Sequence, residues 1–160
     1  MQGIYSLIIS LSQGKEITIG KLGIAFFPAG YYVYTGSALG SSSTSLFGRM
    51  RRHLSKEKRK HWHIDYLLDA AVAKVVGVVL SETALRKEHE VVKSLEAGSK
   101  FRRVMKGFGS SDCRSGCAAH LQYYSGQELA DLENVVCEAH RSVELSPKKL
   151  EPSLIRDLHI

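Results

Sequence analysis

The sequence predicts a single α+β domain, in which helices flank a small, mainly antiparallel central sheet. Two observations lead to this fold class: short strand-like runs separated by turns fill the N-terminal part, and apolar residues recur at helical spacing later in the chain. Of the 160 residues, 44% are hydrophobic and 24% charged, which excludes a wholly disordered chain. We expect the main domain over residues 1–125 and a C-terminal helix packed on it over 126–145. The sequence predicts no structure for the tail over 146–160.

The strands are predicted from runs in which aromatic and β-branched residues dominate, a composition typical of pleated sheets. In chain order they cover Gly3–Leu11, Lys15–Ile19, Ile24–Phe27, Tyr31–Thr35 and Ala73–Leu80. The last of them is nearly all apolar, as expected for a central strand. Short turn-like segments separate the first four, so we expect these strands to form local hairpins.

A first helix is predicted to begin before Leu46, because Leu46, Met50 and Leu54 recur at helical spacing. A short polar side chain is expected to cap its N-terminus. The candidates for this cap are Ser43, Thr44 and Ser45.

Three later helices are expected over Ile64–Ala71, Thr83–Leu95 and Gln127–Val143. The middle one is predicted to start in the polar segment that ends at Thr83, and to stop at Gly98. Its spacing predicts that three apolar side chains face inward, namely Leu85, Val92 and Leu95.

Charge favours a polyanionic partner such as nucleic acid. Lys and Arg total 22 against 16 Asp and Glu, which gives a net charge of +6. Basic side chains displace condensed counterions from phosphates, so clustered positive charge promotes binding to nucleic acid. The basic residues gather in two stretches, which contain Arg49, Arg51, Arg52, Lys56, Lys58, Arg59 and Lys60, and then Lys100, Arg102, Arg103 and Lys106. The alternative is that these stretches are two solvated faces.

No membrane segment and no secretory signal are recognisable. No apolar run approaches the roughly 20 residues that a membrane helix needs, and Met1 leads directly into strand-like sequence. Three cysteines without a signal peptide indicate a reducing cytoplasm and no disulfide framework.

Cysteine and histidine spacing leaves a zinc site open. Cys113, Cys117 and His120 form C-x₃-C-x₂-H, and Cys137 and His140 form C-x₂-H. Four such ligands can close a tetrahedral zinc site, although this spacing matches no common zinc finger. The alternative is a partly buried cluster of reduced thiols.

Several segments together resemble the GIY-YIG nuclease superfamily. Gly3-Ile4-Tyr5 on the first strand and Tyr34-Thr35-Gly36 closing a later strand are similar to its two signature triplets, with Thr35 where isoleucine or valine is usual. LFGRMRRH, which ends at His53, resembles the superfamily helix with its R-x-x-x-H pattern. KEHEVVK, which contains Glu88, is similar to the segment that holds the metal-binding glutamate.

Other segments narrow the resemblance to an uncharacterised, largely archaeal branch of this superfamily. They are FPAGYYVYTGSA, HWHIDYLL and GSSDC followed by HL. Members of that branch are sometimes joined to an endonuclease III-like repair domain. The resemblance covers Gln2 to Tyr124 and says nothing about the tail.

The resemblance implies a divalent-metal-dependent endonuclease that hydrolyses phosphodiester bonds, with structured or damaged DNA in repair or recombination as its substrate. Tyr5 would act as general base or orient water, assisted by Tyr34. Arg49 would stabilise the charge of the transition state, and His53 would hydrogen-bond Tyr5 or the phosphate. Glu88 would hold Mg²⁺ or Mn²⁺.

Further residues are expected around this core of the site. Arg52, Lys60 and His63 would contact the substrate, and Asp112 would take the place of a family polar residue. DNA is the expected partner, together with a repair protein that supplies targeting.

Each expected role has a structural alternative. Tyr5 and Tyr34 can be half-buried strand aromatics, Arg49 can be a solvated base, and Glu90 is a rival to Glu88 for the metal. Two other functions also remain: a non-catalytic nucleic-acid binder and a zinc-stabilised interaction domain. The site further requires that the strand over Ile24–Phe27 does not separate the strands of the two tyrosines.

Overall fold

A six-stranded antiparallel sheet organises the part of the chain that the computed structural model describes, residues 1–39, 45–55, 59–109 and 119–156. The strand order is β6-β7-β4-β1-β5-β8, and every neighbouring pair is antiparallel. These strands are β1 (Gly3–Leu11), β4 (Gly30–Ala38), β5 (Ala73–Glu82), β6 (Phe101–Arg103), β7 (Leu121–Tyr124) and β8 (Pro147–Leu150). Together with the helices described next, this sheet confirms a single α+β domain.

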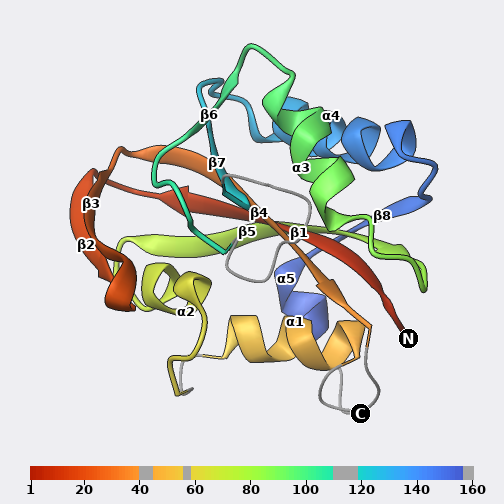
Figure 1. The fold of residues 1–160 in the computed structure, drawn as a ribbon, viewed down its shortest axis with the longest axis horizontal. Coiled ribbons are helices and arrows are strands. Elements are labelled where there is room, and N and C mark those ends of the chain that lie inside the picture. Colours follow the sequence, from red (N-terminus) through yellow and green to blue (C-terminus); the bar gives the residue numbers. More distant parts are fainter. Residues whose placement is uncertain (40–44, 56–58, 110–118, 157–160) are drawn as a thin grey trace.

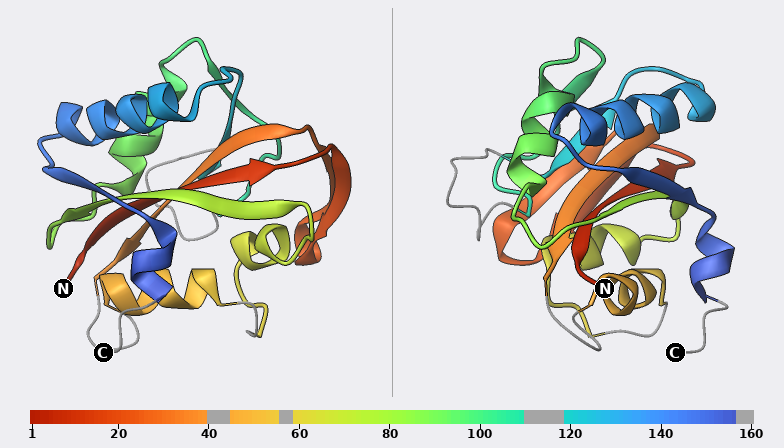
Figure 2. Two further views of the ribbon diagram at one scale, coloured as in Figure 1. Left: turned by 180° about the vertical axis from the view of Figure 1, so that it is seen from behind. Right: turned by 90° about the vertical axis from the view of Figure 1, so that its right-hand side faces the viewer.

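Five α-helices in the described ranges form layers on the two faces of the sheet (Figures 1 and 2). On one face lie α1 (Leu46–Leu54), α2 (His63–Leu68) and α5 (Pro152–Arg156); on the other lie α3 (Glu88–Glu96) and α4 (Leu129–Ser142). Side chains alternate between the faces of a strand, so Tyr5 and Leu7 of β1 pack toward α1 while Ile4 and Ile8 pack toward α3 and α4. Both faces are buried, and β1 is therefore apolar along most of its length.

The hairpin of β2 (Lys15–Ile19) and β3 (Gly23–Phe27), joined by a short 3₁₀ turn over Gly20–Leu22, forms a separate two-stranded sheet. It follows β1 and precedes β4 in sequence but does not intervene between them, since β1 pairs directly with β4 from Gly3↔Ala38 to Leu11↔Gly30. The strands that carry Tyr5 and Tyr34 are therefore adjacent, as the expected site requires.

The helix expected over Thr83–Leu95 was predicted to begin too early. β5 extends to Glu82, and the backbone N–H of Thr83 donates to the Gln2 carbonyl, which prolongs the pairing of β5 with β1. α3 begins only at Glu88. Leu85 therefore lies in the connection and is 59% exposed, so the prediction that it faces inward was wrong.

The other helices lie close to their predicted positions. Ser45 caps α1 by accepting a hydrogen bond from the Gly48 N–H at 3.3 Å. The helix expected over Gln127–Val143 is observed as α4, and the one expected over Ile64–Ala71 is observed as the shorter α2. In the tail, β8 pairs with β5 and α5 packs through the buried Ile155 into the core beneath the sheet. None of these helices is long and apolar enough to cross a membrane.

Candidate active site

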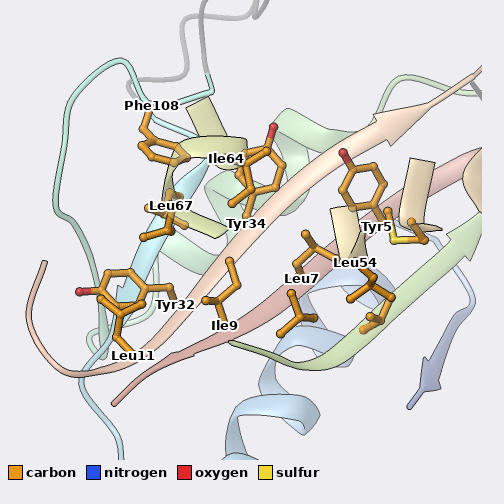
Figure 3. Close-up of a cluster of buried hydrophobic side chains, with 14 of the residues drawn as sticks. Tyr5, Leu7, Ile9, Leu11, Tyr32, Tyr34, Leu54, Ile64, Leu67 and Phe108 are labelled. Carbon is orange, nitrogen blue, oxygen red and sulfur yellow. The ribbon is translucent and has the colours of Figure 1, made fainter. Parts of the chain in front are cut away.

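Tyr5 and Tyr34 lie side by side on the face of the sheet that α1 and α2 cover. In the register of β1 and β4, Tyr5 is opposite Gly36 and Tyr34 is opposite Leu7, so the two tyrosines are diagonal neighbours on one face. Their ring centroids are 6.3 Å apart. Figure 3 shows both hydroxyls pointing to the same side, away from Leu7 and Ile9.

The hydroxyl of Tyr5 lies 2.9 Å from Nε2 of His53, and both side chains are buried. His53 comes from the last turn of α1, one helical turn after Arg49. Residues four positions apart share a helix face, so the R-x-x-x-H spacing directs both side chains toward β1. Leu46, Met50 and Leu54 anchor this helix in the same core.

Arg49 lies between the tyrosine and the loop before α2. Its guanidinium stacks on the Trp62 ring, with 4.3 Å from Cζ to the ring centroid, and donates to the Ser37 carbonyl at 3.4 Å. Its positive charge also acts on the Tyr5 side chain. These contacts leave a planar cation beside the phenol in a fixed orientation.

Burial sets the protonation state of Tyr5. Loss of solvent around the ring raises the pKa of Tyr5 to about 12, although the positive charge of Arg49 acts in the opposite direction. With this pKa, only on the order of 10⁻⁵ of the molecules carry a phenolate near pH 7. Tyr5 is therefore a neutral phenol with a histidine acceptor or donor at hydrogen-bond distance.

A pocket of about 440 Å³ opens beside these residues, and side chains from both helical layers line it. In the described part of the chain, β7 pairs with β4 only from Tyr31 to Tyr34. One further backbone hydrogen bond, from the Thr35 N–H to the His120 carbonyl at 3.1 Å, follows this ladder, and the pocket lies beside this end of β4. Its lining includes Tyr5, Tyr34, Arg49, His63, Arg86, Glu88 and His120.

Glu88 enters this pocket from the first residue of α3. Its Oε2 atom is buried and has no hydrogen-bond partner among the described residues. Glu90, its rival, is exposed and does not line the pocket. A carboxylate oxygen held free inside a polar pocket fits a hard divalent cation, which takes one or two carboxylates together with water and phosphate oxygens.

His63 also lines the pocket, and its tautomer is determined by a neighbour. The backbone N–H of Gly109 donates to His63 Nδ1 at 2.8 Å. Because Nδ1 accepts, the proton of the neutral ring is on Nε2. His63 can then serve as a hydrogen-bond donor to a bound oxygen.

Arg52 and Lys60, both expected to contact substrate, have partners within the protein. Arg52 binds both carboxylate oxygens of the buried Asp65 at 2.8 Å and stacks on Trp62 with 4.3 Å to the ring centroid. Lys60 forms an exposed ion pair with Asp69 at 2.9 Å and is absent from the pocket lining. Within this structure Arg52 positions Trp62, whereas Lys60 lies at the surface.

The zinc ligands considered from the sequence do not come together in the described residues. Cys137 and His140 are buried in the core beneath α4, and both ring nitrogens of His140 contact serine hydroxyls. His120 lies in the pocket instead. Asp112, Cys113 and Cys117 fall outside the described residues, and among those that are described no three His, Cys, Asp or Glu side chains are arranged to hold a metal.

Several residues that shape the pocket had no role predicted from the sequence. A Cβ atom at Gly36 would lie 2.5 Å from the Tyr5 hydroxyl, so only glycine lets the phenol lie across β4. Asp65 holds the loop before α2, since one of its oxygens accepts from the backbone N–H groups of His61 and Trp62 at 2.8 and 2.9 Å. An aspartate three residues after the N-cap is a local helix-start signal that could have identified Asp65. No comparable sequence signal could have identified Arg86.

Comparison with curated proteins gives no match, and comparison with solved structures gives none either. Comparison with family models does give one. The matched segment, residues 4–145, runs from the strand that carries Tyr5 to the turn after α4 and so includes every pocket residue named above. The model is described as a domain of unknown function, DUF123, and because it matches most of the sequence, the chain belongs to the DUF123 family.

Proposed function

We propose that this protein is a divalent-metal-dependent endonuclease of the GIY-YIG type, which hydrolyses phosphodiester bonds in structured or damaged DNA. The observation that carries the proposal is the meeting of Tyr5, Arg49 and Glu88 in one pocket. These side chains come from a strand and from helices on opposite faces of the sheet. They are three of the residues to which the resemblance assigns the reaction.

In the proposed reaction, Tyr5 works as a neutral relay and not as a preformed phenolate. Its oxygen orients the attacking water, and its own proton faces Nε2 of His53 at 2.9 Å. As the bond from the water oxygen to phosphorus forms, the bond from phosphorus to the leaving oxygen breaks and that oxygen keeps the electron pair. The water proton passes to Tyr5 and the Tyr5 proton passes to His53. This route suits a phenol whose pKa is about 12, because the phenolate never has to accumulate.

Arg49 and Tyr34 bind the phosphate in this proposal. The guanidinium is held by Trp62 and Ser37, so it is already oriented before charge develops on the phosphate oxygens. The Tyr34 hydroxyl points the same way as that of Tyr5 and donates to a second oxygen. His63 adds a third donor through Nε2.

Glu88 would hold the divalent cation, which when bound stabilises the negative charge on the leaving oxygen. The carboxylate suits this role because no described residue is a hydrogen-bond partner of its buried Oε2. Arg86 at the mouth of the pocket and the net charge of +6 favour the approach of a polyanion.

The test is cleavage of labelled duplex, flapped and branched DNAs with Mg²⁺, with Mn²⁺ and with EDTA. Wild type, Tyr5→Phe, Arg49→Ala and Glu88→Gln are compared under single-turnover conditions. We expect metal-dependent cleavage by wild type, and a fall of about 10²-fold or more in each variant, since each removes a group that acts in the transition state. Tyr5→Phe should bind DNA almost as well as wild type.

Arg141→Ala is the matched control for Arg49→Ala. Arg141 is an exposed base on α4 that pairs with Glu138, so its loss removes the same charge outside the pocket. Cleavage that is equal in all variants would indicate a contaminating nuclease. Binding without cleavage would favour the non-catalytic nucleic-acid binder.

A further inference from the structure

A second pocket residue besides Glu88 has a buried polar atom without a hydrogen-bond partner among the described residues. Nε2 of His120 is also buried without a hydrogen-bond partner in the part of the chain that the structure describes, and the residue as a whole is only 6% exposed. Both residues line the same pocket, and the Glu88 carboxylate acts electrostatically on the His120 ring. A buried polar atom without a partner destabilises a fold, so two of them in one pocket point to a ligand that satisfies both.

The backbone holds His120 firmly in this position. Its N–H donates to the Phe108 carbonyl at 2.7 Å, and its carbonyl accepts from the Thr35 N–H at 3.1 Å. Among the described residues, the ring nitrogen Nε2 is the buried atom of His120 that has no partner.

An imidazole nitrogen and a carboxylate oxygen are both common ligands of divalent metal ions. The two buried atoms that lack a partner in this pocket, His120 Nε2 and Glu88 Oε2, are one of each kind.

We propose that His120 Nε2 and Glu88 Oε2 together bind one divalent transition-metal ion, with Mn²⁺ preferred over Mg²⁺. The inference rests on the proposed function, because the endonuclease chemistry is what calls for a cation at Glu88. A site with a single carboxylate suits Mg²⁺, which takes oxygen ligands and retains several waters. An imidazole nitrogen adds affinity for transition metals, and very little for Mg²⁺.

The experiment is a Mn²⁺ titration of the full-length protein, followed by electron paramagnetic resonance. Pulsed spectra of the bound ion reveal coupling to a directly bonded imidazole nitrogen. We expect this coupling in wild type and its loss in His120→Gln and in Glu88→Gln. Since the loss of an outer-shell partner alone weakens metal binding by about 10- to 100-fold, His120→Gln should weaken Mn²⁺ binding by at least about 10-fold and change Mg²⁺ binding little.

His61→Gln is the matched control, because His61 also lines the pocket but is exposed. It should retain both the nitrogen coupling and the affinity, and thermal unfolding with EDTA checks that His120→Gln is folded. Mn²⁺ bound at Glu88 without nitrogen coupling would overturn the inference. So would coupling that persists in His120→Gln, or no binding of Mn²⁺ at all. DNA cleavage is scored separately, so a failure of the endonuclease proposal is distinguished from a failure of this metal site.

Discussion

At the scale of single residues, Gly36 determines how closely the Tyr5 ring can approach β4. The nearest atoms to a Cβ at this position are the Tyr5 hydroxyl at 2.5 Å and its Cζ at 2.7 Å. Real Cβ atoms do not approach other atoms so closely, and the ring is fully enclosed. Any larger residue at position 36 therefore has to move the phenol away from His53.

Gly36→Ala should destabilise the fold by about 1–3 kcal/mol, the usual cost of overpacking a filled core. Gly77→Ala in β5 is the matched control, because its Cβ would meet only Ile8, at 3.5 Å. Urea unfolding of both variants measures the difference. In the cleavage assay, the displaced phenol should cost about 10²-fold, as misplacement of a catalytic group by 1 Å can. Equal stability of the two variants would contradict this account of Gly36.

At the scale of elements, an ion pair between Arg52 and the buried Asp65 joins α1 to α2. Asp65 is fully buried in α2 and receives two hydrogen bonds from Arg52 of α1, and two from backbone N–H groups of its own N-terminal turn. Burial alone would raise the pKa of this carboxyl, but the Arg52 and backbone hydrogen bonds outweigh it and lower the pKa below its usual value. The pair fixes Trp62, on which both Arg49 and Arg52 stack.

Arg52→Ala should cost about 3 kcal/mol of unfolding free energy, because it leaves a buried carboxylate without its cation. Lys60→Ala breaks an exposed pair with Asp69 and should cost less than about 1 kcal/mol. Urea unfolding at neutral pH compares the two. Similar losses in both variants would show that burial of Asp65 does not determine the strength of the pair.

The elements also show which features a local pattern can predict. The strand over Gly3–Leu11 was predicted with its observed bounds, because its composition alone specifies a buried strand. The start of α3 was not, because the cap-like segment ending at Thr83 is used to extend β5 along β1. That pairing is between residues far apart in the sequence, and no window of neighbouring residues contains it. β8 was not predicted for the same reason, because it pairs with β5, which is distant in the sequence.

For the candidate site, the resemblance supplied the residues and the structure supplied their arrangement. Spacing along one helix predicts that Arg49 and His53 share a face. No spacing predicts that Glu88 from α3 and His120, the residue before β7, reach the same pocket, since this depends on where β7 begins beside β4. His120 was considered with Cys113 and Cys117 only because these residues are close in sequence.

At the scale of the whole molecule, a buried polar network joins the second helical layer to the sheet. His140 of α4 contacts Ser6 of β1 at 3.0 Å and Ser81 of β5 at 2.8 Å, and Ser6 also contacts Thr35 of β4 at 2.9 Å. One α4 side chain thus contacts two strands directly and is linked to a third through Ser6. Both of its nitrogens are occupied, and burial lowers the pKa of His140 to about 4.

This pKa predicts a loss of stability in mild acid. An unfolded histidine takes up its proton near pH 6.5, whereas folded His140 does so only near pH 4. Between these values the unfolded state binds more protons, so the free energy of unfolding falls as the pH falls. The shift corresponds to about 3 kcal/mol once the pH is below 4.

His140→Gln removes the titration but keeps a side chain that can form hydrogen bonds. Urea unfolding between pH 7 and pH 4 should show a clearly smaller loss of stability for this variant than for wild type. Parallel curves for the two proteins would mean that other groups cause the acid sensitivity.

The outer position of β8 has a consequence for the behaviour of the protein in concentrated solution. β8 pairs with Val78–Ser81 of β5, a strand whose side chains there are all buried. Without β8, the backbone groups of β5 would form an open sheet edge, at which a second molecule can add a strand. β8 itself presents Pro147, Lys148 and Lys149, residue types that discourage such pairing. A protein truncated after Glu144 should therefore self-associate in light-scattering measurements at concentrations where the full chain does not. By covering the edge of β5, β8 prevents aggregation.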